Sequence, residues 1–546
     1  MIDDFSRERN QRPLVFARQA PSNITCHAII KLPGNKNPSD LGTKSPVWTL
    51  CIKSAMKIPV ILCLAVFLSA PAGPATSQGL VLEDETYDAL PQLAQLEGYK
   101  DQDLPPAVDL SAYCPPVRNQ GDVYSCVGWA VGYGALTIKK AILAQCTDRK
   151  RIEEQANSAM FIYNQIKRES CAQGARISDA LNLIREKGDC LASEFDTDVE
   201  DCERRPDETL LNRTALDTIA DYLTLFGLQA SAEEKIRRTI RALSGNEPVI
   251  IGMMVRKNFY QLHDAKYWWP NLGNTTPAGG HAMVVVGYDL PSASFLLFNS
   301  WGTVWGDRGF IRIKFEDFAE HCKYGFILKM GENARMGETI NAQSASLHPV
   351  RTISGAASLD YLDGEEAGGS PLFRRSAVTG TGNGVYRATG RDWQTGQLFQ
   401  LAAWAEQHGL YLYVFSIDPT ETIHVHWPRS FRVSDRFSGL NESALLLDPQ
   451  ARATIPGPDQ ALRLNQSGHN TLYLLFAAKE VKHLDFIAAK MRDCTGDYRE
   501  RLESLLGKHL VPLADIRFEA DRPAFTAATR SDGYMVPMVV VLNARN

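Results

Sequence analysis

The stretch that decides the fold runs Asn299-Ser-Trp-Gly-Thr-Val-Trp-Gly-Asp-Arg-Gly-Phe310. Its first residue follows a histidine, His281, by 299 − 281 = 18 residues, and that histidine stands just ahead of a β-branched run that predicts a strand. The histidine in turn follows a cysteine, Cys126, by 281 − 126 = 155 residues. The shorter gap has the length of a hairpin, whereas only a folded chain can bring the cysteine to the other two residues. The sequence therefore predicts a Cys-His-Asn constellation that the fold assembles.

The cysteine lies at the start of a predicted helix. Residues 125–136 read Ser-Cys-Val-Gly-Trp-Ala-Val-Gly-Tyr-Gly-Ala-Leu, and such crowding of small and apolar residues is typical of a helix that is buried on most sides. We expect Ser125 to cap the helix, which puts Cys126 in the first turn, where unpaired backbone N–H groups and the helix dipole favour a thiolate. A cysteine alone in this place is more often a buried structural residue, so His281 and Asn299 carry the functional interpretation.

At these residues the sequence resembles the papain-like cysteine peptidases, and the resemblance extends over about residues 105–330. It implies an α+β fold of two lobes, one helical and one a β-barrel or sheet, with a cleft between them. The roles it implies are Cys126 as nucleophile, His281 as acid and base, Asn299 as the group that orients the imidazole, Gln120 as the oxyanion-hole side chain, Trp301 as a cover over the Asn299 to His281 hydrogen bond, and Gly174 as a partner of the substrate backbone.

The chemistry explains why these residue types are needed. Cleavage by a thiol requires a thiolate at neutral pH, and an imidazolium beside a helix N-terminus can lower a cysteine pKa from about 8.5 to about 3–4. His281 then returns a proton to the leaving amine. The neutral amide of Asn299 fixes the ring without adding charge to a pair that is already ionic. Gln120 and the backbone N–H of Cys126 would stabilise the oxyanion, and one such donor is worth roughly 3–4 kcal/mol.

The sequence departs from the family pattern beside the nucleophile. Val127 stands where the family usually has a tryptophan, so part of the wall beside the thiol must differ. Residues 122–124 contain no cysteine where the family places one half of a disulfide, and Cys171 looks like the usual other half. Cys171 must then pair elsewhere, with Cys190 or Cys202 as the nearby candidates, or stay free.

Composition excludes several classes of protein. The chain has 546 residues, of which 44% are hydrophobic and 22% charged, as is typical of a soluble globular protein with two or three cores. Its net charge of −5 lacks the basic excess that binding to a phosphate backbone requires, so we expect no nucleic-acid partner. We expect no cofactor. His424 and His426 alternate on one predicted strand, but no third ligand accompanies them, so we expect no metal.

The N-terminal region predicts export. Residues 58–70 are uncharged and apolar, follow two lysines and precede a small-residue segment, which is the layout of a signal peptide at 56–78 that starts near Met56. This core is shorter than the ~20 residues of a membrane span, so we expect no span in the mature protein, which would be secreted or periplasmic, with disulfides permitted. Residues 1–55 predict disorder or a misassigned start. Residues 79–104 form a segment too short for the helical inhibitory propeptide that family members usually carry.

The remaining sequence predicts a domain at 105–334, a linker at 335–384 and a second domain at 385–546. Gly, Ser, Ala and Thr dominate the linker. Short strands with a helical insert follow it, which predicts a β-sandwich and resembles an uncharacterised bacterial domain appended to peptidases. In the first domain the predicted helices cover 158–167, 177–186, 210–223 and 233–243, and the predicted strands 248–255, 295–298 and 310–314; the insert in the second domain covers 498–506.

These inferences favour an exported, bacterial-type cysteine peptidase that acts on proteins or peptides, as an endopeptidase or an exopeptidase. One alternative is a papain-like binding or adhesion protein that lacks turnover, and Val127 and Tyr124 beside the nucleophile favour it. A transglutaminase-like acyl transferase also uses Cys and His, but normally with an Asp as third residue and without the segment that begins at Asn299. Nothing in the sequence indicates the partner of the C-terminal domain.

Overall fold

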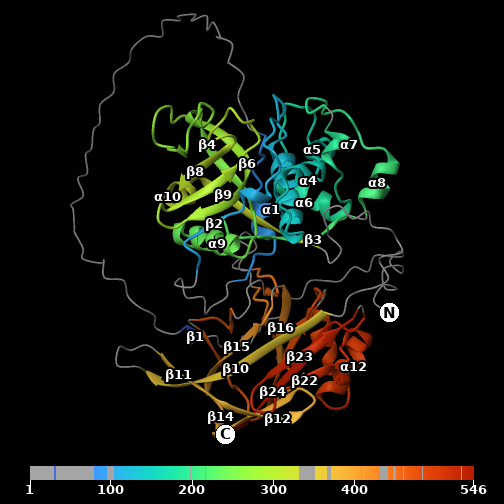
Figure 1. The fold of residues 1–546 in the computed structure, drawn as a ribbon. Helices are drawn as coiled ribbons and strands as arrows, with labels where there is room; N and C mark the ends of the chain where they lie inside the picture. The colour runs from blue at the N-terminus through green and yellow to red at the C-terminus, as the bar shows by residue number, and fades with distance from the viewer. Residues whose placement is uncertain are drawn as a thin grey trace, which may run out of the picture.

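The computed structural model describes residues 30–31, 79–94, 104–330 without 197 and 216, 351–365, 371–430 without 408, 441–446, 451–481 without 459, and 484–546 without 531. The predicted signal peptide and residues 335–350 of the predicted linker lie outside these ranges. So does the predicted disordered segment, apart from strand β1 (Ile30–Lys31). Figure 1 shows two bodies, the upper one built of helices and a sheet and the lower one rich in strands. The fold is therefore α+β with an additional β-rich region at the C-terminus.

A helical lobe follows strand β2 (Ala107–Asp109). Its central element is a continuous helix over residues 126–143, which consists of α2 (Cys126–Gly128), the π-helical η4 (Trp129–Leu136) and α3 (Thr137–Leu143). Side chains cap three of the other helices, because Asp148, Ser158 and Asp207 accept from backbone N–H groups in the first turn. These other helices are α4 (Arg149–Glu154), α5 (Ala159–Ile166), α6 (Ile177–Glu186), α7 (Ala192–Phe195) and α8 (Glu208–Thr214).

The central helix is packed on two sides, and its glycines permit this. A Cβ at Gly128 would lie 2.2 Å from the carbonyl oxygen of Ala159 in α5. A Cβ at Gly134 would lie 2.8 Å from a methyl group of Val284 in the sheet. Glycine thus lets helix α5 and the sheet approach the backbone closely. The buried helix that the small residues predict is confirmed.

The second lobe is an eight-stranded sheet with the order β3-β9-β4-β6-β7-β8-β5, in which β2 also pairs with β6. Helices α9 (Ala232–Ser244) and α10 (Phe315–His321) contact it. Its strands are β3 (Ile219–Thr224), β4 (Val249–Arg256), β5 (Tyr267–Trp268), β6 (Pro277–Asp289), β7 (Ser294–Phe298), β8 (Phe310–Lys314) and β9 (Cys322–Met330).

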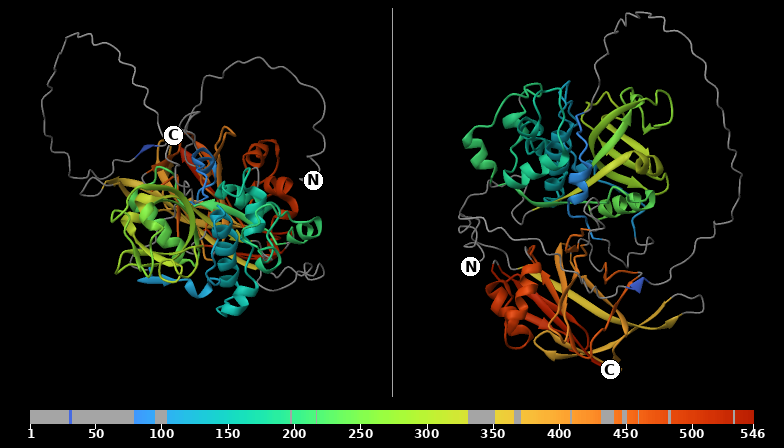
Figure 2. Two further views of the ribbon diagram at one scale, coloured as in Figure 1. Left: turned by 90° about the horizontal axis from the view of Figure 1, so that it is seen from above. Right: turned by 180° about the vertical axis from the view of Figure 1, so that it is seen from behind.

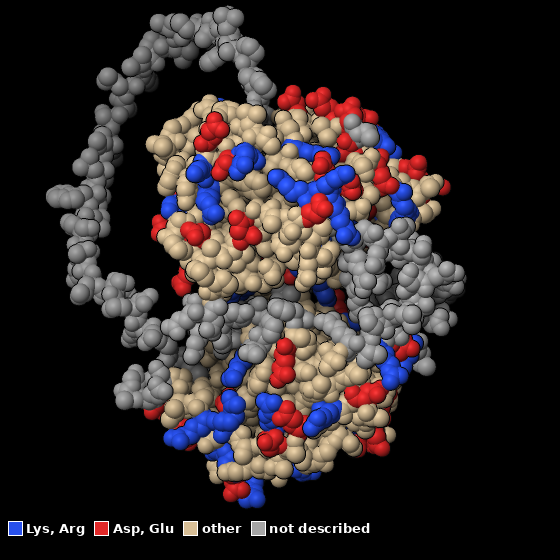
Figure 3. All heavy atoms as spheres, in the orientation of Figure 1, with Lys and Arg blue, Asp and Glu red and all other residues tan. Residues whose placement is uncertain are grey.

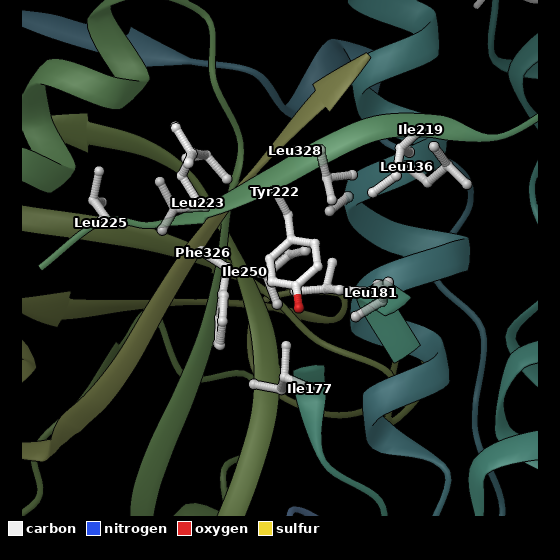
Figure 4. Close-up of a cluster of buried hydrophobic side chains, with 14 of the residues drawn as sticks. Leu136, Ile177, Leu181, Ile219, Tyr222, Leu223, Leu225, Ile250, Phe326 and Leu328 are labelled. Carbon is white, nitrogen blue, oxygen red and sulfur yellow. The ribbon is translucent and has the colours of Figure 1, made fainter. Parts of the chain in front are cut away.

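The predicted helix over 210–223 is wrong in its second half, since α8 ends at Thr214 and β3 begins at Ile219. A shared core explains the difference. Figure 4 shows Leu181 of α6 near Tyr222 of β3, with Phe326 of β9 on the other side of that ring. Tyr222 and Phe326 pack edge to face at 6.2 Å. A short apolar run fits both helical and strand periods, and here pairing with β9 decides between them.

Two further sheets form the C-terminal region and face each other across a second core. One has the order β1-β20-β15-β10-β23-β22 and the other β12-β13-β24-β21-β16-β17. Alternation along β16 (Leu410–Ile417) separates two faces, because Leu412 and Val414 enter the core between the sheets while Tyr411 and Tyr413 point to the opposite side. Helices α11 (Leu484–Lys490) and α12 (Tyr498–Leu506) contribute to the core on that side.

The predicted linker is wrong from residue 351 onward, because β10 is a central strand that pairs with β11, β15 and β23. Small residues here serve packing rather than flexibility: a Cβ at Gly355 would lie 2.8 Å from the rings of Phe476 and Phe525. The remaining strands of the region are β10 (Arg351–Glu365), β11 (Pro371–Arg375), β12 (Ala377–Gly382), β13 (Val385–Thr389), β14 (Trp393–Gln394), β15 (Leu398–Ala405), β17 (Ile423–Trp427), β18 (Leu445–Leu446), β19 (Ala453–Ile455), β20 (Gln460–Arg463), β21 (Gly468–Ala477), β22 (Ile516–Phe518), β23 (Ala524–Thr529) and β24 (Met535–Arg545).

Acidic and basic side chains are interspersed on the face of both bodies that Figure 3 shows. Among the helices in the described ranges, none combines the length and the apolar character that crossing a membrane requires.

Candidate active site

Cys126 is the first residue of the central helix. Ser125 occupies the N-cap position, but its hydroxyl accepts from the indole N–H of Trp129 at 3.2 Å and makes no cap hydrogen bond, so the expected side-chain cap is wrong. The backbone N–H groups of Ala282 and Val127 hydrogen-bond to the sulfur of Cys126. Ala282 follows His281 in β6, so the fold brings the cysteine to the strand that carries the histidine.

The Cys126 sulfur is covered. The residue is 0% exposed. Burial raises the pKa of its thiol to about 12, although the hydrogen bonds from backbone N–H groups lower it. In this covered state the side chain of Cys126 is therefore a neutral thiol, and a thiolate requires a change in its surroundings.

His281 and Asn299 form a buried pair. The Nε2 atom of His281 lies 2.7 Å from Oδ1 of Asn299. His281 sits within β6, not ahead of the strand as the sequence suggested, and Asn299 directly follows β7. Strands β6 and β7 pair antiparallel, with Val284 opposite Phe298, so the 18-residue gap is a hairpin, as predicted. Because an amide oxygen can only accept, Nε2 carries the proton and Nδ1 is the acceptor nitrogen of the ring.

An aromatic cluster covers this pair. The ring of Trp301 lies 4.6 Å from that of His281 at 31°. Tyr260 stacks on the same indole at 5.2 Å, and Phe259 contacts it edge to face at 5.3 Å. The indole N–H of Trp305 donates to the carbonyl oxygen of Phe259 at 2.8 Å, which links residues 259–260 to the segment that follows Asn299. Phe259 and Tyr260 had no signal in the sequence, because the 3-10 helix η5 (Lys257–Phe259), which Tyr260 follows, is too short to show a period.

Gln120 is held at both atoms of its side-chain amide. Its Nε2 donates to the carbonyl oxygen of Val123 at 2.9 Å, and its Oε1 accepts from the hydroxyl of Ser300 at 2.8 Å. Its backbone N–H also donates to the carbonyl oxygen of Ser300 at 2.8 Å. An amide NH₂ has two hydrogens, so the second can serve an oxyanion. Ser300, which follows Asn299, thereby links the glutamine to the histidine pair, a role that sequence reasoning missed.

Gly174 lies against the backbone of Gly79. A Cβ at this position would lie 2.0 Å from the carbonyl oxygen of Gly79, so a backbone segment already runs along it. Cys171 forms a disulfide with Cys202, with 5.7 Å between the Cα atoms, which decides between the two candidates that the sequence left open. Cys190 is a buried free cysteine.

A buried cysteine at a helix start, a histidine–asparagine pair on a hairpin and a buried glutamine, set between a helical lobe and a sheet, are typical of thiol peptidases. The sequence agrees at the level of the family: residues 104–325 match the papain family of cysteine proteases. Because of this match, residues 104–325 are hereafter called the papain-family domain.

Known proteins resemble this part of the chain. Human cathepsin L2 is 25% identical over 240 residues, which cover 40% of this chain and 63% of that protein. An uncharacterized peptidase C1-like protein of Acanthamoeba polyphaga mimivirus is 22% identical over 208 residues, 37% of this chain and 65% of that protein. The chain thus spans less than two thirds of the length of these curated relatives. Among solved structures, xylellain, a cysteine protease from Xylella fastidiosa, is 21% identical with a TM-score of 0.36, over 45% of this chain and 96% of that chain.

Proposed function

We propose that the protein is a cysteine-type peptidase that hydrolyses peptide bonds with Cys126, His281, Asn299 and Gln120. The observation that carries the proposal is the 2.7 Å hydrogen bond between His281 and Asn299, on a strand whose next N–H faces the Cys126 sulfur. The family match of residues 104–325 supports it. Proteins or peptides are the substrates that this chemistry takes.

The reaction follows from the protonation state of the histidine. Nδ1 of His281 takes the thiol proton, and the sulfur of Cys126 forms a bond to the carbonyl carbon of the substrate, whose oxygen gains the electron pair. The imidazolium returns the proton to the amide nitrogen, and the C–N bond breaks. Water then attacks the thioester carbonyl carbon and gives one proton to Nδ1 of His281. The C–S bond breaks, the carboxylic acid leaves, and the imidazolium returns the proton to the sulfur of Cys126.

Gln120 stabilises the tetrahedral intermediate. Its second Nε2 hydrogen and the backbone N–H of Cys126 are the two donors for the oxyanion. Val123 and Ser300 fix the amide from both ends, so little reorganisation is needed when the charge develops.

We also propose that the protein is exported. The disulfide between Cys171 and Cys202 supports this, because disulfides persist mainly in oxidising compartments. We expect the mature chain to start between about residues 73 and 83, after the predicted signal peptide. N-terminal sequencing of exported material tests this, and a cytoplasmic protein that begins at Met1 would contradict it.

The alternative, a papain-like protein without turnover, rests on the burial of Cys126 and its raised pKa. Labelling with a thiol-directed epoxide and mapping of the modified residue separates the two functions. We expect modification of Cys126 together with loss of activity on a casein or peptide library. Cys126→Ala should be inactive, whereas full activity in that variant would refute the mechanism.

A further inference from the structure

The indole of Trp129 points back along the central helix to the residue that precedes Cys126. Trp129 is 2% exposed and is the first residue of η4. Its indole N–H donates to the hydroxyl oxygen of Ser125 at 3.2 Å, and its backbone N–H donates to the carbonyl oxygen of the same serine at 3.2 Å. Trp129 is therefore bound to both the side chain and the backbone of Ser125.

The direction of each hydrogen bond in this contact follows from the groups involved. An indole N–H can only donate, so the hydroxyl oxygen of Ser125 accepts. The one hydrogen of this hydroxyl is then left for the carbonyl oxygen of Val123, which lies 3.4 Å from the hydroxyl oxygen. Trp129 therefore orients a hydroxyl that could otherwise rotate about its C–O bond.

The carbonyl oxygen of Val123 is also the acceptor for the proposed oxyanion-hole side chain. It accepts from Nε2 of Gln120 at 2.9 Å and from the backbone N–H of Ser125 at 2.8 Å, in addition to the Ser125 hydroxyl. A chain of hydrogen bonds thus runs from the indole of Trp129 through the hydroxyl and this carbonyl group to the glutamine amide. None of the four residues is more than 5% exposed, so water has little access to these bonds.

The segment that carries this carbonyl group has no regular secondary structure. Residues 121–125 form neither helix nor strand, so no ladder of backbone hydrogen bonds fixes the orientation of Val123. The backbone N–H of Tyr124 donates to the carbonyl oxygen of Cys171 at 3.0 Å, which holds the segment to another part of the helical lobe. The contact between Ser125 and Trp129 holds the same segment to the central helix.

The packing around the Trp129 ring fixes the direction of its N–H group. Tyr133, one turn later in the helix, contacts the ring edge to face at 5.0 Å. The ring also lines a cavity of only about 10 Å³, which Asn299 and Ser300 line as well and which has room for no more than one water molecule. The indole therefore has no space to turn to another acceptor, and its hydrogen bond is formed before a substrate binds.

We propose that Trp129 is a positioning residue for the oxyanion hole and that its indole N–H fixes the side-chain amide of Gln120. This inference deepens the proposed peptidase function and rests on it. A donor stabilises the charge of the tetrahedral intermediate most effectively when it is already oriented as the charge develops. Without the indole N–H the Ser125 hydroxyl is free to rotate, Val123 loses an oriented donor, and the amide can turn its second hydrogen away from the oxyanion. The loss falls on the transition state rather than on substrate binding, so kcat decreases and KM does not.

The test is a double-mutant cycle in the full chain. Trp129→Phe keeps an aromatic ring and removes the N–H group, and Gln120→Ala removes the proposed oxyanion donor. Both variants, the double variant and the unchanged protein are compared by kcat and KM on a short peptide, with the concentration of competent protein taken from complete epoxide labelling of Cys126. We expect Trp129→Phe to lower kcat about tenfold and to change KM less than twofold. In the Gln120→Ala background the same substitution should lower kcat less than twofold, because the donor that it misplaces is already gone.

Two further variants make the test independent of the folding of Trp129→Phe. Ser125→Ala removes the hydroxyl and keeps the indole, so it should reproduce the tenfold loss of kcat and add nothing to Trp129→Phe. Trp268→Phe is the matched control, because Trp268 is 0% exposed and its indole N–H donates to Oδ1 of Asn258 at 3.0 Å, which is not part of the chain of hydrogen bonds to Gln120. This control should lower the melting temperature as Trp129→Phe does and leave kcat within twofold of the unchanged protein.

The outcomes separate this inference from the function on which it rests. If Trp129→Phe and Ser125→Ala keep kcat within twofold of the unchanged protein, or raise KM instead, Trp129 does not position the oxyanion donor and the peptidase function stands. The inference is also overturned if Trp129→Phe lowers kcat by the same factor with and without Gln120, since its effect then does not pass through that amide. If the unchanged protein neither reacts with the epoxide at Cys126 nor hydrolyses peptide, the peptidase function fails, and the inference fails with it.

Discussion

Residues 79–94, hereafter the strap, contain helix α1 (Asp84–Ala89), which lies between the helical lobe and the sheet lobe (Figures 1 and 2). The strap hydrogen-bonds to Ala175 and to Gly280, the residue before His281. Tyr87→Phe should activate the protein by loosening the strap at Tyr87, which is 1% exposed. The hydroxyl makes hydrogen bonds of 2.6 and 3.1 Å to backbone groups of Phe226 and Gly325, and burial raises its pKa, so it is a neutral donor at every relevant pH. Phenylalanine keeps the ring but deprives one buried C=O and one buried N–H of this partner. Each such group costs about 1–3 kcal/mol when the strap docks, whereas water solvates it when the strap is released.

The lower bound for two groups, about 2 kcal/mol, corresponds to a roughly thirtyfold larger population of the released state. We therefore expect kcat/KM on a short peptide to rise about thirtyfold for as long as the docked state predominates. Tyr222→Phe is the matched control, because this buried tyrosine of β3 donates to Asn182 at 2.9 Å and lies outside the strap. Both variants should lower the melting temperature, but only Tyr87→Phe should raise activity. A lowered melting temperature with unchanged kcat/KM and unchanged labelling of Cys126 in Tyr87→Phe would refute the reasoning.

Four further predictions concern the site and its surroundings. Gln120→Ala should lower kcat by about 10²–10³ with a smaller effect on KM, because it removes a donor to the oxyanion; steady-state kinetics decide this. Cys171→Ala should lower the free energy of unfolding by about 2–4 kcal/mol and keep activity, as denaturant titration and peptide assays would show. A chain that ends near residue 335 lacks Asn441, which contacts Gln92, so its kcat/KM on short peptides should equal or exceed that of the full chain. A loss of more than about tenfold, equivalent to about 1.4 kcal/mol, in a folded sample would mean that the C-terminal region helps to build the cleft. Burial raises the pKa of Glu83, and Asp179 adds to this, so the docked strap favours the protonated carboxyl. Inhibition should therefore be fully present in acid and weaken as pH rises through the raised pKa of Glu83, as the ratio of activities with and without an intact strap would show. In Glu83→Gln this ratio should no longer depend on pH in that range.

Strong periodicity explains which elements could be predicted. The sequence predicts helices over 177–186 and 498–506 and a strand over 310–314, and the structure has α6, α12 and β8 with the same bounds. In each of them the local pattern and the tertiary packing favour the same period. The sequence also predicts that Asn299 meets His281 on a hairpin, since two residues 18 apart need only one turn between two strands.

Tertiary contacts explain what could not be predicted. In residues 351–365 small side chains look like a linker, and only the rings of Phe476 and Phe525 show that Gly355 is a packing position. The strap offers even less to sequence reasoning, because backbone atoms make its contacts with Ala175 and Gly280, and every residue type carries those atoms. The cap expected from Ser125 fails for a related reason, since the indole of Trp129 uses its hydroxyl.

Asn441 and Ser443 hydrogen-bond to the backbone of Gln92 in the strap, and this contact sets an order of events during synthesis. The strap is made early, and the papain-family domain has its last strand once Met330 is made, but Asn441 comes 441 − 330 = 111 residues later. At about 5–20 residues per second, this interval lasts about 6–22 s. During that time the nascent chain has a complete cleft and a strap that is fastened at one end only. A chain that stalls between Met330 and Asn441 would lack the contact between the strap and residues 441–443. Premature termination in this interval should therefore yield a product in which Cys126 is more reactive than in the finished protein.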